Sequence, residues 1–402
     1  MCSGHAGRKQ GRSTAAKPES GGEPQRHKEA AKDRCRPGRT VDPLSLAPAR
    51  PTPVYDAFWR FAAMRQEVFF RRLQGGPPPW TDDAILQRHR FTNAYRASDR
   101  VSQYLIREVI YAGDQSPEEV FFRVLLFKIL NRISTWEGLH ARLGEIRYSS
   151  FAFHLYDEAL CSMLAAGERV FSAAYMMPAG EGELASPRKH RSYLWLLERM
   201  MNDEVPARLV QMTKMRDAFD LLRSYPMLGD FLAYQYVIDL NYSEIVDFSE
   251  MEFVVPGPGA RSGLRKCFAS FGGLGEADLI RVVTERQEEE FETRGIGFRS
   301  LWGRPLQLID CQNLFCEIDK YARVAFPEYE GIGHRTRIKQ VYRPTPGSIS
   351  HWYPPKWGIN HLVALSTPRD GAEQAARPSS PLPGIAGNRA GELRRGDLEL
   401  KE

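Results

Sequence analysis

The sequence predicts an all-α protein, on three observations. The segment that follows Ser116 is apolar on nearly every side, which is typical of a helix in the centre of a domain. Many other segments place apolar residues at helical spacing. No segment alternates apolar and polar residues for long enough to form a large sheet, so only short extended pieces are expected, at 251–255 and 335–343. We therefore expect one compact multi-helix domain over 51–362.

The clearest helix start is Ser116-Pro117-Glu118-Glu119. Ser116 can cap the helix, Pro117 suits its first position, and Glu119 can complete a capping box. A helix start is also predicted at Thr81 or Asp82, and a helical turn at 264–268. The other predicted helices cover, in chain order, 55–73, 91–111, 151–170, 190–203, 206–223, 228–240, 276–293 and 306–325.

Both ends of the chain are predicted to be disordered tails, 1–50 and 363–402, because they are poor in aromatic residues and rich in small, polar and charged ones. The first tail is basic, with 11 Lys/Arg against 5 Asp/Glu, whereas the whole chain has a net charge of +5. The remainder is therefore close to neutral. An argument for nucleic-acid binding must rest on local clusters.

The six cysteines include no CxxC pair, and no Cys/His set has the spacing of a metal site. Neither a disulfide scaffold, a metal nor another cofactor is expected. No apolar run approaches the ~20 residues of a membrane helix, and no secretory signal is evident. We expect no membrane partner and an intracellular protein, nuclear if eukaryotic and otherwise cytoplasmic.

The predicted helix at 91–111 has two different faces. Apolar residues gather on one side, and the opposite side carries Asn93, Arg96, Arg100 and Gln103. Arginine forks and amides clamp phosphates and read base edges, so this face is a candidate DNA-binding surface. The alternative is a solvated face in which Asp99 pairs with a neighbouring arginine.

Three further segments could contact a nucleic acid. Trp80 could stack on a base or could fasten its loop to the core, and the second alternative is favoured. Gly257, Gly259 and Arg261 lie in a glycine-rich, basic segment that could bind phosphate or form an ordinary turn. The segment 331–357 interleaves basic and aromatic residues, which suits an unpaired strand but also a closing segment that wraps the domain.

The helix at 306–325 carries Asp310, Asn313, Glu317 and Lys320 on one face. Such a stripe could hold a polar substrate or supply an acid and a base, whereas a Glu317–Lys320 ion pair is the simpler alternative. The sequence contains no GxxxxGK[ST], HExxH or GxSxG motif, so ATP binding by a P-loop, zinc proteolysis and serine hydrolysis are not predicted.

Four motifs between residues 55 and about 360 resemble the helical domain associated with 5-hydroxymethyluracil DNA kinases, also called the α-glutamyl/putrescinyl thymine pyrophosphorylase family. The resemblance covers about three quarters of the chain. The motifs are RQEVFFRRLQGGPPPWTDDAIL, FTNAYRASDRVSQYL, VIDLNYSEIVDFSEMEFVVPGPGARSG and DCQNLFCEIDKY.

The resemblance implies a role in thymine hypermodification, in which an amine or amino acid displaces the phosphate of an activated base in DNA. The family is thought to be related to helix-hairpin-helix glycosylases, which flip a base out of the duplex. The segment 226–231 then resembles a hairpin, and Asp247, Glu250 and Asp239 become catalytic candidates beside Glu317.

The leading hypothesis is therefore a transferase-like, pyrophosphorylase-like enzyme on DNA that carries a modified pyrimidine. Its expected partners are an amine or amino-acid donor and a separate DNA kinase, because no P-loop is present in this sequence. The alternatives are a non-catalytic module that binds DNA or a modified base, and a DNA glycosylase.

Overall fold

The computed structural model of the chain describes residues 49–175, 177–180, 182–344 and 350–366. All of these residues belong to the unit Thr40–Glu402. The predicted tails fall almost entirely outside the described part of the chain.

Helices dominate the described residues, so the prediction of an all-α fold is confirmed. The one sheet in this part of the chain pairs β1 (Arg50–Pro51) antiparallel with β2 (Phe268–Ser270). The pieces expected to be extended, 251–255 and 335–343, form no strand, and the second contributes only an isolated bridge between Val341 and His89. No helix among the described residues is both long and apolar enough to cross a bilayer.

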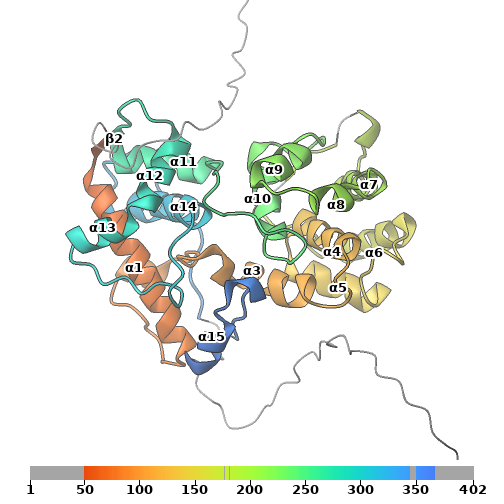
Figure 1. Cartoon of the computed structure of the whole chain (residues 1–402), viewed down its shortest axis with the longest axis horizontal. Helices are drawn as coiled ribbons and strands as arrows, with labels where there is room; N and C mark the ends of the chain where they lie inside the picture. The colour runs from red at the N-terminus through yellow and green to blue at the C-terminus, as the bar shows by residue number, and fades with distance from the viewer. Residues whose placement is uncertain (1–48, 176, 181, 345–349, 367–402) are drawn as a thin grey trace, which may run out of the picture. The chain divides into compact units, whose positions relative to one another are not determined.

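One group of helices packs around α14 (Leu308–Ala325) (Figure 1). Phe58 from the first helix stacks on Phe315 of α14 at 4.4 Å between ring centroids. The group also includes α13 (Gln287–Thr293), whose Phe291 packs edge-on against Trp59. The helices that contact α14 directly are α1 (Pro53–Leu73), α2 (Ala84–Arg88), α11 (Pro258–Cys267) and α12 (Glu276–Glu285).

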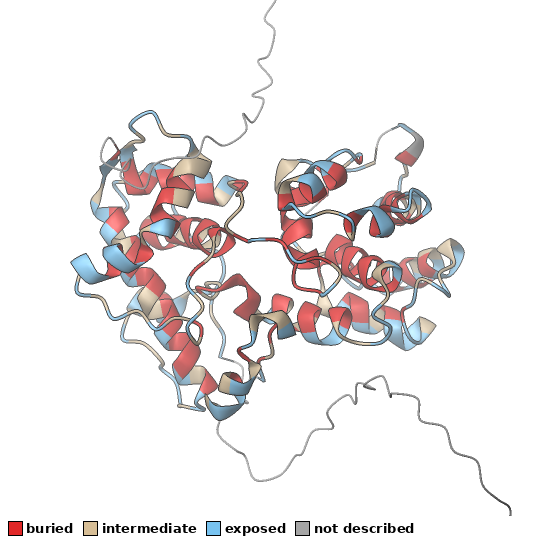
Figure 2. Ribbon diagram, in the orientation of Figure 1, coloured by how far each residue is buried: buried red, intermediate tan, exposed pale blue. Residues whose placement is uncertain are grey.

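A second group packs around α4 (Pro117–Leu130), in which 12 of 14 residues are buried (Figure 2). The prediction of a central helix is confirmed here. The predicted capping box is wrong, because the Ser116 side chain makes no cap bond and the Glu119 carboxylate instead accepts the backbone N–H groups of Tyr148 and Ser149. The other helices of this group are α5 (Ile133–Leu143), α6 (Phe153–Ala165), α7 (Lys189–Asn202), α8 (Val205–Leu209), α9 (Met215–Arg223) and α10 (Asp230–Leu240).

Several predicted helix bounds differ from the structure. The segments 206–223 and 276–293 each form two helices, and the turn expected at 264–268 belongs to α11, which begins earlier. The helices α5 and α15 (Asn360–Ser366) are not predicted from the sequence. Short helical turns occur at Gly182–Leu184 and Pro355–Trp357.

The prediction of one helix over 91–111 is wrong. Residues 91–95 are not helical, and they lead into η2 (Arg96–Ser98), α3 (Arg100–Tyr104) and the π-helical turn η3 (Leu105–Ile110). Carboxylates accept the backbone N–H groups here, since Glu317 binds Thr92 at 3.0 Å, Asp99 binds Asn93 at 2.7 Å and Asp310 binds Arg96 at 2.8 Å. The segment from η2 to η3, hereafter the connector, contacts α14 at one end and α4 at the other.

Candidate nucleic-acid interface

A cleft of about 1080 Å³ lies beside the connector. Its walls come from α1, from 78–81, from 89–93, from the connector and from 341–344 with 350–351. Four of the residues predicted to bind nucleic acid line it, and they are Trp80, Asn93, Arg100 and Gln103. The structure thus brings together two parts of the chain that are far apart in the sequence, one before residue 138 and one after residue 340.

The lining of the cleft is basic. Among the described residues it contains six arginines but only three carboxylates, Asp99, Glu108 and Glu137. Guanidinium groups bind phosphate oxygens in a planar fork, so such a lining suits a polyanion. The six are Arg65, Arg72, Arg90, Arg100, Arg107 and Arg343.

The arginines of the cleft differ in whether their side chains are bonded to the protein. Arg65 is 9% exposed, and it donates to the Thr92 carbonyl and to the Asn93 side chain, each at 2.8 Å. By contrast, the exposed side chains of Arg90, Arg100 and Arg343 make no hydrogen bond or ion pair with any residue that the structure describes. Those three are therefore available to a ligand, whereas Arg65 fixes the floor of the cleft.

Trp80 is held in place and still faces the cleft. Its indole N–H donates to the Gly76 carbonyl at 2.6 Å, the Arg72 guanidinium lies 5.1 Å from its ring centre, and Tyr342 approaches edge-on at 6.4 Å. The preferred prediction, that Trp80 fastens its loop, is supported by these contacts. A fixed aromatic wall is also a suitable stacking surface for a base.

The two amides predicted to read bases are already bonded to the protein. Asn93 accepts from Arg65 and donates to the Ser98 carbonyl at 2.7 Å. Gln103 is 5% exposed, donates to the Ala97 carbonyl at 2.8 Å and accepts the Trp352 N–H at 2.9 Å. These side chains shape the cleft wall rather than offer free hydrogen bonds.

Asp99 is a half-buried carboxylate in this basic cleft, whereas the sequence pattern indicates only an ion-pair partner for a nearby arginine. Burial raises the pKa of its carboxyl to about 7, against the opposing hydrogen bond from Asn93, and the charge of Glu317 adds to the rise. A carboxyl that titrates near neutrality is suited to proton transfer. The available signal was its place inside the motif FTNAYRASDRVSQYL.

Arg96 does not reach the cleft or the solvent. It is 3% exposed and forms an ion pair of 2.6 Å with Asp239, which also pairs with Lys128 at 2.6 Å. The Arg96 guanidinium donates to the Tyr242 hydroxyl as well, at 3.1 Å. The predicted solvent-facing stripe is therefore wrong at Arg96, because the chain is not helical before this residue and turns its side chain inward.

None of the four predicted catalytic carboxylates lines the cleft. Asp239 is in the interior, and Glu250 is 7% exposed and pairs with Arg304 at 2.6 Å. Glu317 is 5% exposed and pairs with Lys320 at 2.6 Å, as the simpler alternative expected, whereas the side chain of Asp247 is 84% exposed. Their catalytic roles stay predictions.

The glycine-rich segment forms the start of α11. Gly257 precedes the helix, and a Cβ at Gly259 would lie 2.2 Å from the Cys316 sulfur of α14. Arg261 is half exposed and pairs with Glu276 at 2.7 Å. These glycines let neighbouring side chains pack close to the start of α11, and the segment is helical from Pro258 on. Phosphate contact by Gly257, Gly259 and Arg261 stays a prediction.

A helical domain with an arginine-lined cleft is the class that the fold and the site define. A family model described as "5-hmdU DNA kinase, helical domain" matches residues 52–331, and the chain belongs to this family, as its motifs predicted. A curated relative, the 5-hmdU DNA kinase of Bacillus phage SP10, is 25% identical over 292 residues, which cover 67% of this chain and 45% of the relative. The chain thus matches less than half of that relative's length. No solved structure shows a significant match.

Proposed function

We propose that this chain takes part in the modification of thymine-derived bases in DNA, and that its cleft binds the strand that carries the modified pyrimidine. The observation that carries the proposal is the arginine-lined cleft built around the connector. Family membership and the printed name of the phage relative support the choice of substrate. Free arginines at the cleft can bind phosphates while Trp80 and Tyr342 flank a base.

The proposed reaction is the displacement of phosphate from a phosphorylated 5-hydroxymethyl pyrimidine by an amine or amino acid. A nitrogen–carbon bond forms at the methylene carbon, the carbon–oxygen bond to the phosphate breaks with its electron pair, and the attacking amine loses a proton. We assign acceptance of that proton to Asp99, which lines the cleft and whose raised pKa supports the role, and binding of the leaving phosphate to the arginines. The sequence contains no P-loop, so the preceding phosphorylation is assigned to a separate DNA kinase.

Arg100→Ser is expected to weaken DNA binding uniformly across sequences and to reduce the slope of log affinity against log salt by about 1, because one phosphate contact is lost. Fluorescence anisotropy of labelled DNA over a salt series measures both quantities. Arg208→Ser, which removes an exposed arginine outside the cleft, is the matched control and should leave the slope unchanged.

Arg261→Ser distinguishes DNA binding in the cleft from DNA binding on the surface of α11. An unchanged salt slope in this variant assigns the phosphate contacts to the cleft. If Arg261→Ser reduces the slope and Arg100→Ser does not, DNA binds elsewhere and the assignment to the cleft is overturned.

Asp99→Asn is expected to lower base modification at least about 100-fold while leaving DNA affinity unchanged, since an amide cannot accept the proton. In the unsubstituted protein the rate should fall as the pH drops through about 7, where the Asp99 carboxylate is protonated. The assay incubates the protein with DNA that contains phosphorylated 5-hydroxymethyluracil and a panel of amines, followed by mass spectrometry of the nucleosides.

The introduced amide keeps an oxygen that can accept the backbone N–H of Asn93, so the Asp99→Asn variant should fold. At pH 8 it should be at least as stable as the parent, because a raised carboxyl pKa means that ionisation of Asp99 costs folding free energy. Parallel assays of Asp247→Asn, Glu250→Gln and Glu317→Gln decide between the carboxylates. Loss of activity in one of these three, with full activity in Asp99→Asn, would contradict the role of Asp99.

The same assay tests the alternative functions. α9 and α10 are joined by the short turn 224–229, as in a helix-hairpin-helix pair, which favours a glycosylase as the second candidate. Asp239, however, is held in buried ion pairs outside the cleft. Abasic sites in the DNA would support the glycosylase, and DNA binding with neither abasic sites nor a mass change would support a non-catalytic module.

A further inference from the structure

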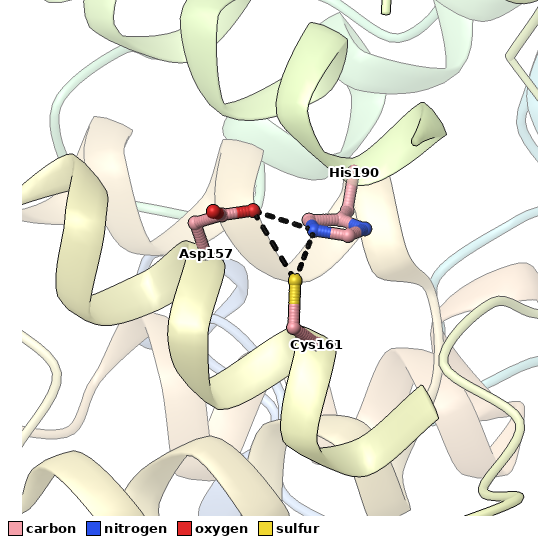
Figure 3. Close-up of side chains that lie close together, drawn as sticks. All are labelled: Asp157, Cys161 and His190. Carbon is pink, nitrogen blue, oxygen red and sulfur yellow. Dashed lines mark hydrogen bonds and ion pairs between the residues drawn. The ribbon is translucent and has the colours of Figure 1, made fainter. Parts of the chain in front are cut away.

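Three metal-ligating side chains of different types meet where α6 and α7 pack together, outside the cleft (Figure 3). Asp157 and Cys161 lie one turn apart on α6, and His190 lies at the start of α7. The His190 Nε2 atom lies 2.8 Å from the Asp157 Oδ1 atom and 3.5 Å from the Cys161 Sγ atom, which is itself 3.5 Å from Oδ1. His190 is 1% exposed, so its ring is fixed by packing.

These distances approach the edges of a tetrahedral zinc site. Bond lengths of ~2.3 Å to sulfur and ~2.0–2.2 Å to nitrogen and oxygen give edges of about 3.5 Å from sulfur and about 3.4 Å between nitrogen and oxygen. The Cys161 sulfur lies 3.5 Å from both the His190 nitrogen and the Asp157 oxygen, as such a site requires. The His190 nitrogen and the Asp157 oxygen are closer together than in a zinc site, at 2.8 Å. A bound ion would replace the proton of that hydrogen bond and increase the distance between the His190 nitrogen and the Asp157 oxygen by about 0.6 Å.

Two arginines border the cluster. Arg191 holds Asp157 with a fork, from Nε to Oδ1 at 2.8 Å and from Nη2 to Oδ2 at 2.7 Å. Arg188 is exposed, and its guanidinium donates to the Cys161 sulfur. Arg191 can stay as an outer partner of the carboxylate, whereas Arg188 occupies the open corner and can turn into the solvent, leaving that corner to water.

We propose that Asp157, Cys161 and His190 bind one Zn²⁺ ion, with water as the fourth ligand. Binding removes the thiol proton of Cys161, which is released to solvent. It also needs the tautomer of His190 that carries its proton on Nδ1, a buried atom without a hydrogen-bond partner among the described residues, so that Nε2 can bind the metal. Arg188 competes with the ion, so this cation weakens the site and its removal strengthens it. The sequence shows no zinc-like spacing because the two ligands from α6 and the one from α7 are separated by the segment 166–188.

The test uses the full chain, stripped of metal with a chelator and titrated with Co²⁺. We expect a thiolate-to-cobalt charge-transfer band that saturates at one ion per chain and disappears when Zn²⁺ is added. Cys161→Ser should abolish the band, and Asp157→Asn should weaken Co²⁺ binding. Arg188→Ala should tighten it by about tenfold, because one competing charge at the edge of the site is removed.

Two control variants exclude other thiols. Cys316→Ser changes the other half-buried cysteine, and the Cys2→Ser/Cys35→Ser pair changes the cysteines outside the described residues. Both controls should keep the band. A full chain that gives no band, or a band that survives Cys161→Ser, overturns the proposal, and thermal unfolding of each metal-free variant checks that it is folded.

Discussion

Gly263→Ala is expected to destabilise the helix group around α14 strongly. A Cβ atom at this position of α11 would lie 1.8 Å from the Phe315 carbonyl oxygen and 2.7 Å from its carbon. The clashing atoms belong to the backbone of α14 and cannot rotate away as a side chain could, so α11 and α14 must move apart. We expect a loss of more than about 3 kcal/mol of unfolding free energy, out of the ~5–15 kcal/mol typical of a domain.

Urea unfolding followed by circular dichroism measures this loss. Gly297→Ala is the matched control, because its added Cβ meets no atom within 4 Å, and it should remain within about 0.5 kcal/mol of the parent. A loss below about 1 kcal/mol in Gly263→Ala would show that the two helices do not pack this closely.

Asp239→Asn is expected to be the most destabilising change of a single charge. The carboxylate is 1% exposed and pairs with Arg96 and Lys128, each at 2.6 Å. Burial acts to raise the pKa of Asp239, but the two cations outweigh it and the pKa is lowered. The amide leaves both cations buried without a counter-charge, which costs about 3–5 kcal/mol.

The effect should depend on pH through Lys128. Burial lowers the pKa of Lys128 to about 8, against the attraction of Asp239. At a pH between about 8 and the ordinary pKa of lysine, the unfolded chain therefore binds more protons than the folded chain. In that range the stability of the fold rises with pH. In Asp239→Asn this pKa falls further, and the rise in stability begins at a lower pH. Urea unfolding at pH 7 and pH 9 measures the difference.

A second substitution tests the cause. Lys128→Met in the Asp239→Asn background removes one of the two unpaired cations and should restore part of the lost stability. Asp247→Asn, an 84% exposed carboxylate, should change stability by no more than about 0.5 kcal/mol. Equal stability of Asp239→Asn and the parent would mean that the buried ion pairs do not form.

The helices could be predicted where local pattern decides the structure. α4 is apolar all round and α1 follows helical spacing, and both lie where the sequence indicated. The segment 91–95 could not be predicted in this way, because its N–H groups bind carboxylates such as Glu317, 225 positions away. A distant partner of this kind overrides local propensity, and no local pattern reveals it.

The candidate site was predicted in part. Trp80 and Arg100 line the cleft, but the residues 341–344 that also line it could not be placed there from the sequence. Glycines such as Gly259 suggested a loop because glycine is a poor helix former, whereas Gly259 and, further along α11, Gly263 allow α14 to pack at short distance. Arg96 suggested a phosphate contact, since the sequence alone does not show that Asp239 lies beside it in the interior.

The connector limits how this protein can change in evolution. The backbone of Arg96 is bound to α14 through Asp310 and its side chain to α10 through Asp239, while Arg100, a few residues later, lines the cleft. Substitutions that reshape this wall therefore disturb the anchorage of both helix groups. A change in what the cleft binds is more readily accommodated on the wall that includes Arg343, whose exposed side chain makes no hydrogen bond or ion pair with a described residue.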